Sequence, residues 1–489
     1  MWFYRPILLC EVTGTAETQI PISTQEDKPR LSYKPKSSTR RVDRWLDFVV
    51  QIAGSAPVLL FILCGLFVWA FIGIHYSKTD EWVAIISDVQ AILCYVFDSL
   101  LMRQILREYS DSTTIMAEIK SRSSSNSRMF AELKKRLGQD TTTRIVNMCK
   151  DEPLQPLDPS LKAHSFFARC MIFSATVFGH IITVALYWVA IAIWLGFGHS
   201  CGWTNRWQLY INDSTSALMI FVFAFLTCLR ECYSKCTMTC VDAIFRTDAT
   251  IELKLRELNQ DQLPNLPEIV SPRKEGCFQT AIYYYADLIG TLVGIVILVL
   301  VIIAWVAAGP IFNHDRTWWL LIGTYAGLVG LFDSFVLRNI QAKVHDFIGD
   351  QTELVRACDE QIFADLSMPL PPLSTHIHHS LTHRLSRSMD KISSHLLMVV
   401  AGLILTIGCI MASSLMHWSV TGQLISNVPP SIIETFFMII LITGQNDADA
   451  KARIELTNIY HRRQRLLSFV VNARGQAGPA RLSDAPASL

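Results

Sequence analysis

The sequence predicts an all-α polytopic membrane protein with about eight transmembrane helices. Of its 489 residues, 51% are hydrophobic and only 17% are charged, which is too little charge to solvate a globule of this size. Apolar runs approach the roughly 20 residues that a spanning helix needs. The runs also occur in pairs around short turns, and tryptophans bracket three of the four turns. A repeat of this kind is stronger evidence for architecture than a local motif.

Each pair of runs is expected to form a helical hairpin. The paired runs are 57–74 with 82–102, 170–195 with 209–229, 286–307 with 318–337, and 395–415 with 432–443. The bracketing tryptophans are Trp69 and Trp82, Trp194 and Trp207, and Trp305 and Trp318. The fourth pair lacks them, and its last run is short. Gly323 and Gly327 give the third pair a small-residue face, which favours close helix packing.

The charge pattern predicts the orientation of these hairpins. Lysine and arginine collect in the long connecting segments and not in the short turns, so the long segments and both termini are expected in the cytoplasm. The four hairpins then share one orientation, with any pseudo-symmetry axis along the membrane normal. Either a ring around a central path or two pairs packed face to face fits this pattern.

Six segments follow from these spans. They are a flexible basic tail (1–44), three hairpins each followed by an inner loop (45–165, 166–280 and 281–394), a fourth hairpin (395–465), and a flexible C-terminal tail (466–489).

Several classes of protein are disfavoured. Thirteen cysteines scattered through apolar and basic segments are typical of reduced thiols and not of a secreted disulfide framework. No G-x-x-x-x-G-K-[ST] loop is present, so there is no site for ATP-driven pumping, and no H-E-x-x-H motif occurs. The net charge of +1 gives no indication of a nucleic-acid partner. We therefore expect neither an enzyme nor a cofactor.

Acidic residues within the apolar runs are the main functional candidates. An ionised carboxylate in hydrocarbon costs at least a few kcal/mol, so it marks a functional site or a buried partner. Arg103 and Arg338 follow Asp98 and Asp333 by five residues, about 140° around a helix, so neither pair shares a face. The partner must be a distant base, a polar network or a cation. The candidate metal pathway comprises Asp88, Asp98, Asp213, Asp333 and Glu434, with Asp287 as a further acid at a helix head.

Histidines and cysteines supply a second group of candidates. Each outer turn carries one histidine, namely His75, His199, His314 and His417. Together they could collect iron, copper or zinc at the mouth, or be ordinary interface histidines.

On the inner side, thiols recur at every fourth position, at Cys228, Cys232, Cys236 and Cys240. They form one helical stripe, either a soft-metal chelate or buried packing. A histidine-rich loop contains His376, His378, His379 and His383, and it is either a metal buffer or a solvated polar loop.

Three segments resemble the low-affinity iron permease family, whose fourfold form is found in fungal plasma membranes. They are the W-Q-L-x-I-N motif at 207–212, the R-T-D-A-T-I-E-L-K-L-R-E-L run at 246–258, and the run 442–456 followed by Y-H-R-R at 460–463. The resemblance implies uptake of Fe(II). In the family, a polar Q-N pair lies at the end of a helix, here called the helix-end pair. Gln445-Asn446 matches it best, and Arg338-Asn339 and Arg103-Gln104 match it less well. The corresponding pair of the second hairpin, Arg230-Glu231, does not match.

The expected function is therefore low-affinity entry of a divalent cation across the plasma membrane, with Fe(II) as substrate and Cu, Zn, Co and Mn as competitors. The membrane potential favours each charge by about 2.3 kcal/mol per 100 mV, so no other fuel is required. The outer histidines and Asp213 would collect the ion, and Asp88, Asp98 and Asp333 would replace part of its hydration shell. Gln445 and Asn446 would lie on the exit side. A transport-inactive metal sensor and a membrane di-iron enzyme are the alternatives.

Overall fold

The computed structural model describes residues 5–19, 33, 41–76, 80–150, 152–157, 166–313, 316–372, 388–389 and 391–481. Seven helices within these ranges are long and apolar enough to span a membrane. The pair α8 (Cys277–Ile289) and α9 (Leu292–Ala308), bent by 66°, makes an eighth if it forms one span. This confirms the predicted class of all-α polytopic membrane protein.

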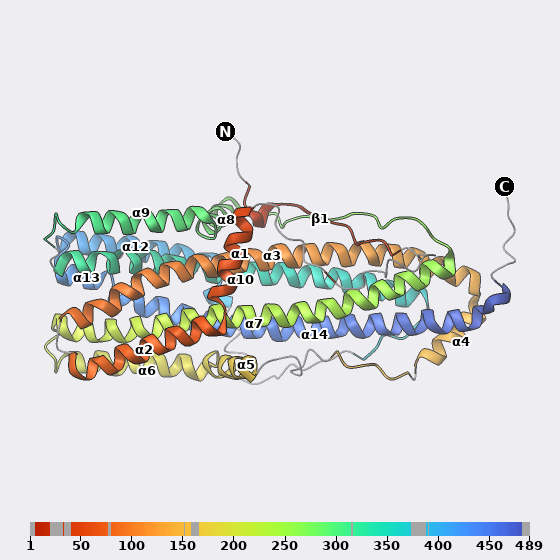
Figure 1. Ribbon diagram of the computed structural model, residues 1–489, viewed down its shortest axis with the longest axis horizontal. Coiled ribbons are helices and arrows are strands. Elements are labelled where there is room, and N and C mark those ends of the chain that lie inside the picture. Colours follow the sequence, from red (N-terminus) through yellow and green to blue (C-terminus); the bar gives the residue numbers. More distant parts are fainter. Residues whose placement is uncertain are drawn as a thin grey trace.

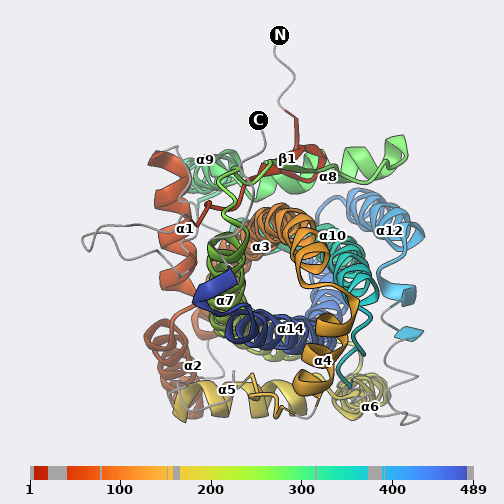
Figure 2. The ribbon, with the colours of Figure 1, turned by 90° about the vertical axis from the view of Figure 1, so that its right-hand side faces the viewer.

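Four long helices form the centre of the molecule. They are α3 (Asp80–Leu137), α7 (Asn205–Asn259), α10 (Arg316–Asp365) and α14 (Val428–Arg481). At 50 to 58 residues, each is roughly 75 to 87 Å long, two to three times the hydrocarbon thickness of a bilayer. The helices contact one another in the order α3, α7, α14, α10 and back to α3. They therefore form a ring, which Figure 2 shows end-on.

Four apolar helices surround one end of this ring, on the left of Figure 1. They are α2 (Ala56–Tyr76), α6 (Ile181–Gly198), α9 (Leu292–Ala308) and α12 (Leu396–Leu415). Only 11% of the apolar stretch of α2 is buried, against 78% for α3 and α7. A helix that is apolar all round but exposed on most of its surface fits lipid as its surroundings. We therefore call the end of the ring that these four helices surround the membrane half. The rest of the four long helices, with the segments that pack on it, is called the extended half.

A break in the helix, at which the continuous backbone changes direction, precedes the outer helices. Helix α1 (Arg41–Ala53) ends before Gly54, α5 (Phe166–Phe178) before Gly179, and α8 (Cys277–Ile289) before Gly290. At two breaks a histidine caps the next helix, because the His180 and His395 side chains accept hydrogen bonds from the backbone of Ile182 and Leu397.

The short helices before these breaks lie crosswise to the ring, as Figures 1 and 2 show for α1, α5 and α8. Helix α1 exposes Trp45, Phe48 and Ile52. This apolar face on a crosswise helix suits the membrane interface. The break also explains why the expected runs at 170–195 and 286–307 are each divided between two helices: the chain changes direction at a glycine.

The bracketing tryptophans stack on each other at three of the outer turns. The ring centroids of Trp69 and Trp82 lie 4.4 Å apart with 7° between the planes. The other two pairs stack at 4.0 and 4.5 Å. In place of such a pair, the fourth connection contains a short helix, α13 (Val420–Ile425), which packs against α7, α10, α12 and α14.

The extended half differs from the expected inner loops, because α3, α7 and α10 continue through much of those segments. The reason is a second apolar core, remote from the membrane, whose buried side chains include Phe130, Leu255, Phe363 and Phe469. Because α14 contributes to this core, it continues to Arg481 through the expected C-terminal tail. Helix α4 (Gln139–Lys150) packs against α14 near this end.

Part of the expected N-terminal tail also packs on the extended half. Residues 5–19 contain a 3-10 helix, η1 (Ile7–Leu9), and a strand, β1 (Val12–Gly14). Strand β1 pairs antiparallel with β2 (Glu268–Val270), with Val12 opposite Val270. Gly14 allows this approach, because a Cβ there would lie 2.6 Å from the Cβ of Ala117 on α3.

Candidate ion pathway

Three carboxyl groups meet inside the ring. Asp98 of α3, Asp333 of α10 and Glu434 of α14 each expose only 1% of their surface. The Asp98 carboxyl interacts electrostatically with both of the others, and Glu434 interacts with Asp333. Because α3 and α14 lie opposite each other in the ring, these three residues, here called the carboxyl cluster, face a common interior.

The carboxyl cluster has no basic partner in the described part of the chain. Both carboxylate oxygens of Asp98 and of Glu434, and Oδ2 of Asp333, also lack a hydrogen-bond donor there. One donor is present: the Tyr285 hydroxyl donates to Asp333 Oδ1 at 2.5 Å. Uncompensated buried carboxylates cost several kcal/mol each, so this arrangement favours protons or a cation as compensation.

The two nearby arginines are directed elsewhere, as helix geometry predicts. Arg103 forms ion pairs with two acids of α1, at 3.0 Å to Asp47 and 3.5 Å to Asp43. Arg338 donates to Gln341 Oε1 at 2.8 Å and to Ser393 Oγ at 3.2 Å.

A glycine makes room for the third acid. A Cβ at Gly330 would lie 2.5 Å from Glu434 Oε1, so only glycine lets this carboxyl lie against α10, one turn before Asp333. Glu434 lies near the start of the expected run 432–443, yet the structure buries it, because α14 begins earlier, at Val428, and the buried residues 426–427 and α13 precede it.

An uncharged polar layer lies about two to three helical turns nearer the outer turns. The Asn212 amide donates to Ser87 Oγ at 3.2 Å. A Cβ at Gly323 would lie 3.3 Å from that hydroxyl and 3.2 Å from Asn427 Nδ2, and one at Gly327 would lie 3.1 Å from Asn427 Oδ1. These residues come from or directly precede all four long helices. The two glycines therefore accommodate a polar side chain, in addition to any role in helix packing.

A polar belt crosses the ring on the other side of the carboxyl cluster. Gln445 Oε1 accepts hydrogen bonds from Arg230 Nη1 at 2.6 Å and from Gln341 Nε2 at 3.0 Å. Arg230 also donates to Glu108 Oε2 at 2.6 Å. Because α7 and α10 lie on opposite sides of the ring, the hydrogen bonds to Gln445 of α14 connect these three helices at this level. The belt thus joins Gln445 to Arg230, the position at which this chain differs from the family's helix-end pair.

In three of the four helix-end pairs, the second residue contacts a break in the outer helices instead, whereas Gln104 donates to the Thr227 carbonyl of α7 at 3.2 Å. Asn446 donates to the Ala175 carbonyl at 2.7 Å, beside the α5–α6 break. Asn339 donates to the Ser394 carbonyl at 2.9 Å, just before α12. A Cβ at Gly54 would lie 3.0 Å from the Cβ of Glu231. The structure therefore places Asn446 away from Gln445, on the outside of the ring.

Beyond the belt lies a cavity of about 1060 Å³, lined by all four long helices. Its lining is rich in charge of both signs. The acids are Glu108, Asp111, Glu231, Asp346, Asp350, Glu353, Asp447, Asp449 and Glu455.

The remaining predicted acids lie outside the carboxyl cluster. Asp213 is buried, and neither of its carboxylate oxygens has a hydrogen-bond partner among the described residues. It directly follows Asn212, about 100° around α7. Asp88 is half-buried. Asp287 is buried in α8.

The predicted histidine and thiol sites are only partly covered by the structure. His75, His199 and His417 are exposed at separate outer turns, whereas His314, His376, His378, His379 and His383 lie outside the described residues. Along α7, Cys228 hydrogen-bonds Cys232, and Cys236 hydrogen-bonds Cys240. Within the ranges that the structure covers, no three His, Cys, Asp or Glu side chains are grouped closely enough to hold a metal together.

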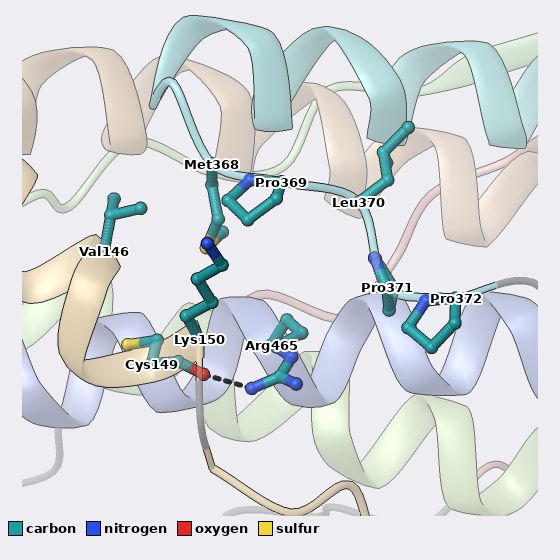
Figure 3. A pocket seen from close by; sticks show the side chains of 9 residues that line it. All are labelled: Val146, Cys149, Lys150, Met368, Pro369, Leu370, Pro371, Pro372 and Arg465. Atoms are coloured by element: carbon teal, nitrogen blue, oxygen red, sulfur yellow. Dashed lines mark hydrogen bonds between the residues drawn. The ribbon is translucent and has the colours of Figure 1, made fainter.

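A smaller pocket of about 200 Å³ lies at the far end of the extended half, between α4 and residues 368–372. Figure 3 shows its apolar and proline-rich lining, where the Arg465 guanidinium donates to the Cys149 carbonyl. Its lining contains no acid, so it is separate from the acidic interior.

Fold and site together define a polytopic α-helical membrane protein whose central helices enclose unpaired acids. The chain belongs to the low affinity iron permease family, whose model matches residues 278–362 and 382–476. The low-affinity iron/zinc ion transport protein fet4 of Schizosaccharomyces pombe is 33% identical over 472 residues, covering 94% of this chain and 79% of that protein. The low-affinity Fe(2+) transport protein of Saccharomyces cerevisiae is 30% identical over 469 residues, covering 88% and 83%. No solved structure matches the chain.

These relatives confirm the resemblance inferred from the motifs. The family model covers the third and fourth helix pairs, whereas the recognisable motifs lie in the second and fourth. Both relatives are named as transporters, so low-affinity iron transport is the activity that the family indicates.

Proposed function

We propose that this protein carries Fe(II) across the plasma membrane at low affinity, through the interior of the helix ring. Zn, Cu, Co and Mn are further candidate substrates, and the names of the relatives mention iron and zinc. The observation that carries the proposal is the carboxyl cluster, because three buried acids without a base form a site for a cation in transit.

The path has three successive environments. In the polar layer, the amides and hydroxyls of Asn212, Asn427 and Ser87 replace some of the ion's water. The carboxyl cluster then supplies oxygen ligands of opposite charge, which suit a divalent cation. No metal is caged by three close ligands within the described residues. A dispersed set fits a path from which the ion must leave.

Beyond the carboxyl cluster, the ion meets the belt and then the cavity. Gln445 and Arg230 lie on the exit side, as proposed for Gln445 from sequence. Acids of the cavity other than Glu108, which is already paired with Arg230, attract the ion after it passes. Entry requires no fuel besides the concentration gradient and the inward-negative potential, which favours a dication by roughly 4.6 kcal/mol per 100 mV.

We further propose four hairpin repeats of one orientation, with both termini and the extended half in the cytoplasm. The contacts at the breaks support the fourfold repeat. Each long helix holds the break of a neighbouring outer helix, at Gly290 by Met102 and Leu106 of α3 and at Gly54 by Glu231 of α7. Asn339 and Asn446 make the corresponding contacts from α10 and α14. Each long helix thus contacts the break that belongs to the hairpin of the preceding long helix in the ring order α3, α7, α14, α10.

Uptake of radioactive Fe(II) by cells expressing the protein tests the proposal. Asp98→Asn, Asp333→Asn and Glu434→Gln keep the side-chain shape but remove the charge. We expect each to lower the initial rate by at least about tenfold, equivalent to about 1.4 kcal/mol. Asp140→Asn, which changes an exposed acid of α4, is the matched control and should transport normally.

The alternatives give different results. If all three variants transport as well as the wild type, the carboxyl cluster is not on the path. If the correctly located wild type shows no uptake above background, the protein is not a transporter, and a metal sensor becomes the better interpretation.

A further inference from the structure

We propose that Tyr285 of α8 is a positioning residue that holds the Asp333 carboxylate ready for the transported cation. This inference rests on the proposed transport function and adds to it a residue from outside the ring. Tyr285 is half-buried on the crosswise helix α8. It belongs to none of the groups of acids, histidines, thiols and amides that the sequence indicated.

Contacts near both ends hold α8 on the ring. The helix packs against α3 and α10. Near its start, Gln279 Nε2 donates to Asn339 Oδ1 of α10 at 2.7 Å. At its end, a Cβ at Gly290 would lie 2.9 Å from Cδ1 of Leu106 on α3, so the break lies close against that helix. The side chains of α8 that face the ring are therefore held in a fixed place.

The Tyr285 side chain is fixed both at its ring and at its hydroxyl. Its ring lies edge-on to that of Phe332 on α10, with centroids 5.1 Å apart and 72° between the planes. Its hydroxyl donates to Oδ1 of the next residue, Asp333, at 2.5 Å. Asp333 Oδ2 has no hydrogen-bond partner in the described part of the chain. One carboxylate oxygen is thus held, and the other remains open to a cation.

This hydroxyl is a feature of one hairpin and not of the repeat. In the first hairpin, Asp98 corresponds to Asp333, because each begins a D-S-x-x-x-R motif. Five residues before the break, where the third hairpin has Tyr285, the first has Val49. Valine offers no side-chain donor, and both carboxylate oxygens of Asp98 lack one among the described residues. A hairpin therefore forms without the hydroxyl, which points to a role in the pathway.

A neutral donor suits an acid that must attract a mobile ion. A hydrogen bond to a carboxylate is roughly twice as strong as one between neutral groups, so the hydroxyl offsets part of the cost of burying the charge of Asp333. Unlike a lysine or arginine, it leaves the net negative charge in place. Without it, the carboxyl would take up a proton or turn to another donor, and the cation would have to displace that partner.

Fe(II) uptake over a range of concentrations tests this role in the full-length protein. Tyr285→Phe removes only the hydroxyl. We expect the half-saturating Fe(II) concentration to rise about tenfold, as the loss of a hydrogen bond to a charged group predicts, and the maximal rate to stay within about twofold. Tyr284→Phe is the matched control, because Tyr284 is the adjacent tyrosine and is 42% exposed. It should transport like the wild type.

A double variant tests whether Tyr285 acts through Asp333. When Tyr285→Phe is added to Asp333→Asn, the charge that the hydroxyl serves is already absent. We therefore expect a further change of less than about twofold, because two changes in one interaction are not additive.

The other outcomes overturn the inference in distinguishable ways, with thermal unfolding of each purified variant measured in parallel. An unchanged or lower half-saturating concentration in Tyr285→Phe overturns the positioning role and leaves the transport proposal intact. A lower maximal rate alone, in a less stable protein, means that Tyr285 serves packing and also overturns it. So does a full additional loss in the double variant. No uptake by the wild type overturns the transport proposal, and this inference with it.

Discussion

The two halves of the ring bury charges in opposite ways. In the membrane half, the three acids of the carboxyl cluster have no basic partner among the residues that the structure describes. In the extended half, Asp248 and Asp359 are buried as deeply, exposed by 1% and 0%. Yet Arg463 pairs with both, at 3.0 and 2.8 Å, and Arg462 pairs with Asp359 at 2.9 Å.

A second paired group lies near the first. Glu252 forms ion pairs with Arg122 at 3.0 Å and with Arg256 at 2.9 Å. It also accepts a hydrogen bond from the Gln19 backbone, which ties the N-terminal segment to α7. Burial alone therefore does not distinguish a functional acid from a structural one. The presence of a fixed base does, because a carboxylate that is already paired has little attraction for a mobile cation.

The largest effect is expected from breaking the paired half. Arg463→Met leaves two carboxylates buried without their common partner, which should lower the free energy of unfolding by about 3–5 kcal/mol. Thermal unfolding of purified protein measures this. Asp98→Asn is the comparison, since it removes a charge that has no base to lose and should not destabilise the protein.

If Arg463→Met unfolds at the same temperature as the wild type, the paired network does not stabilise the extended half. If Asp98→Asn is as destabilising as Arg463→Met, the carboxyl cluster is structural, and the contrast between the two halves fails.

The next effect concerns the space around the cluster. Gly330→Ala places a Cβ 2.5 Å from Glu434 Oε1, so the carboxyl must move, at a cost of about 1–3 kcal/mol. We expect a lower rate of Fe(II) uptake in a protein that still folds. Gly408→Ala on α12 is the matched control, because no atom lies within 4 Å of the new Cβ. Equal uptake by Gly330→Ala and the wild type would show that the position of Glu434 is not critical.

Much of the membrane half could be predicted from the sequence. Apolar runs and paired tryptophans report directly on lipid contact and turns, so the class of fold was confirmed. The five-residue spacing of Asp98 and Arg103 correctly excluded a local ion pair. The contact of Glu434 with Gly330 could not be predicted, because it depends on which helices are opposite in the ring.

The extended half was harder to predict because its helices are amphipathic and charged. Their apolar residues, such as Phe130 and Phe363, are separated by polar ones, a pattern that predicts inner loops and not membrane spans. The partners of Arg463 lie 215 and 104 residues away in the chain, at Asp248 and Asp359. Such long-range pairs leave no local pattern, and only the assembled ring brings them together.

The smallest effect should come from an ion pair that is exposed in the same extended half. Glu132 and Arg136 form a pair at 3.2 Å, one turn apart on α3, with side chains 47% and 48% exposed. Glu132→Ala should change the free energy of unfolding by less than about 0.5 kcal/mol, because water and salt screen such pairs. Thermal unfolding at low and high salt measures it. A loss comparable to that of Arg463→Met would mean that pairing stabilises this half regardless of burial. A negligible loss would show that a carboxylate depends on a fixed base only where water is excluded, which is the condition that the unpaired acids of the membrane half share.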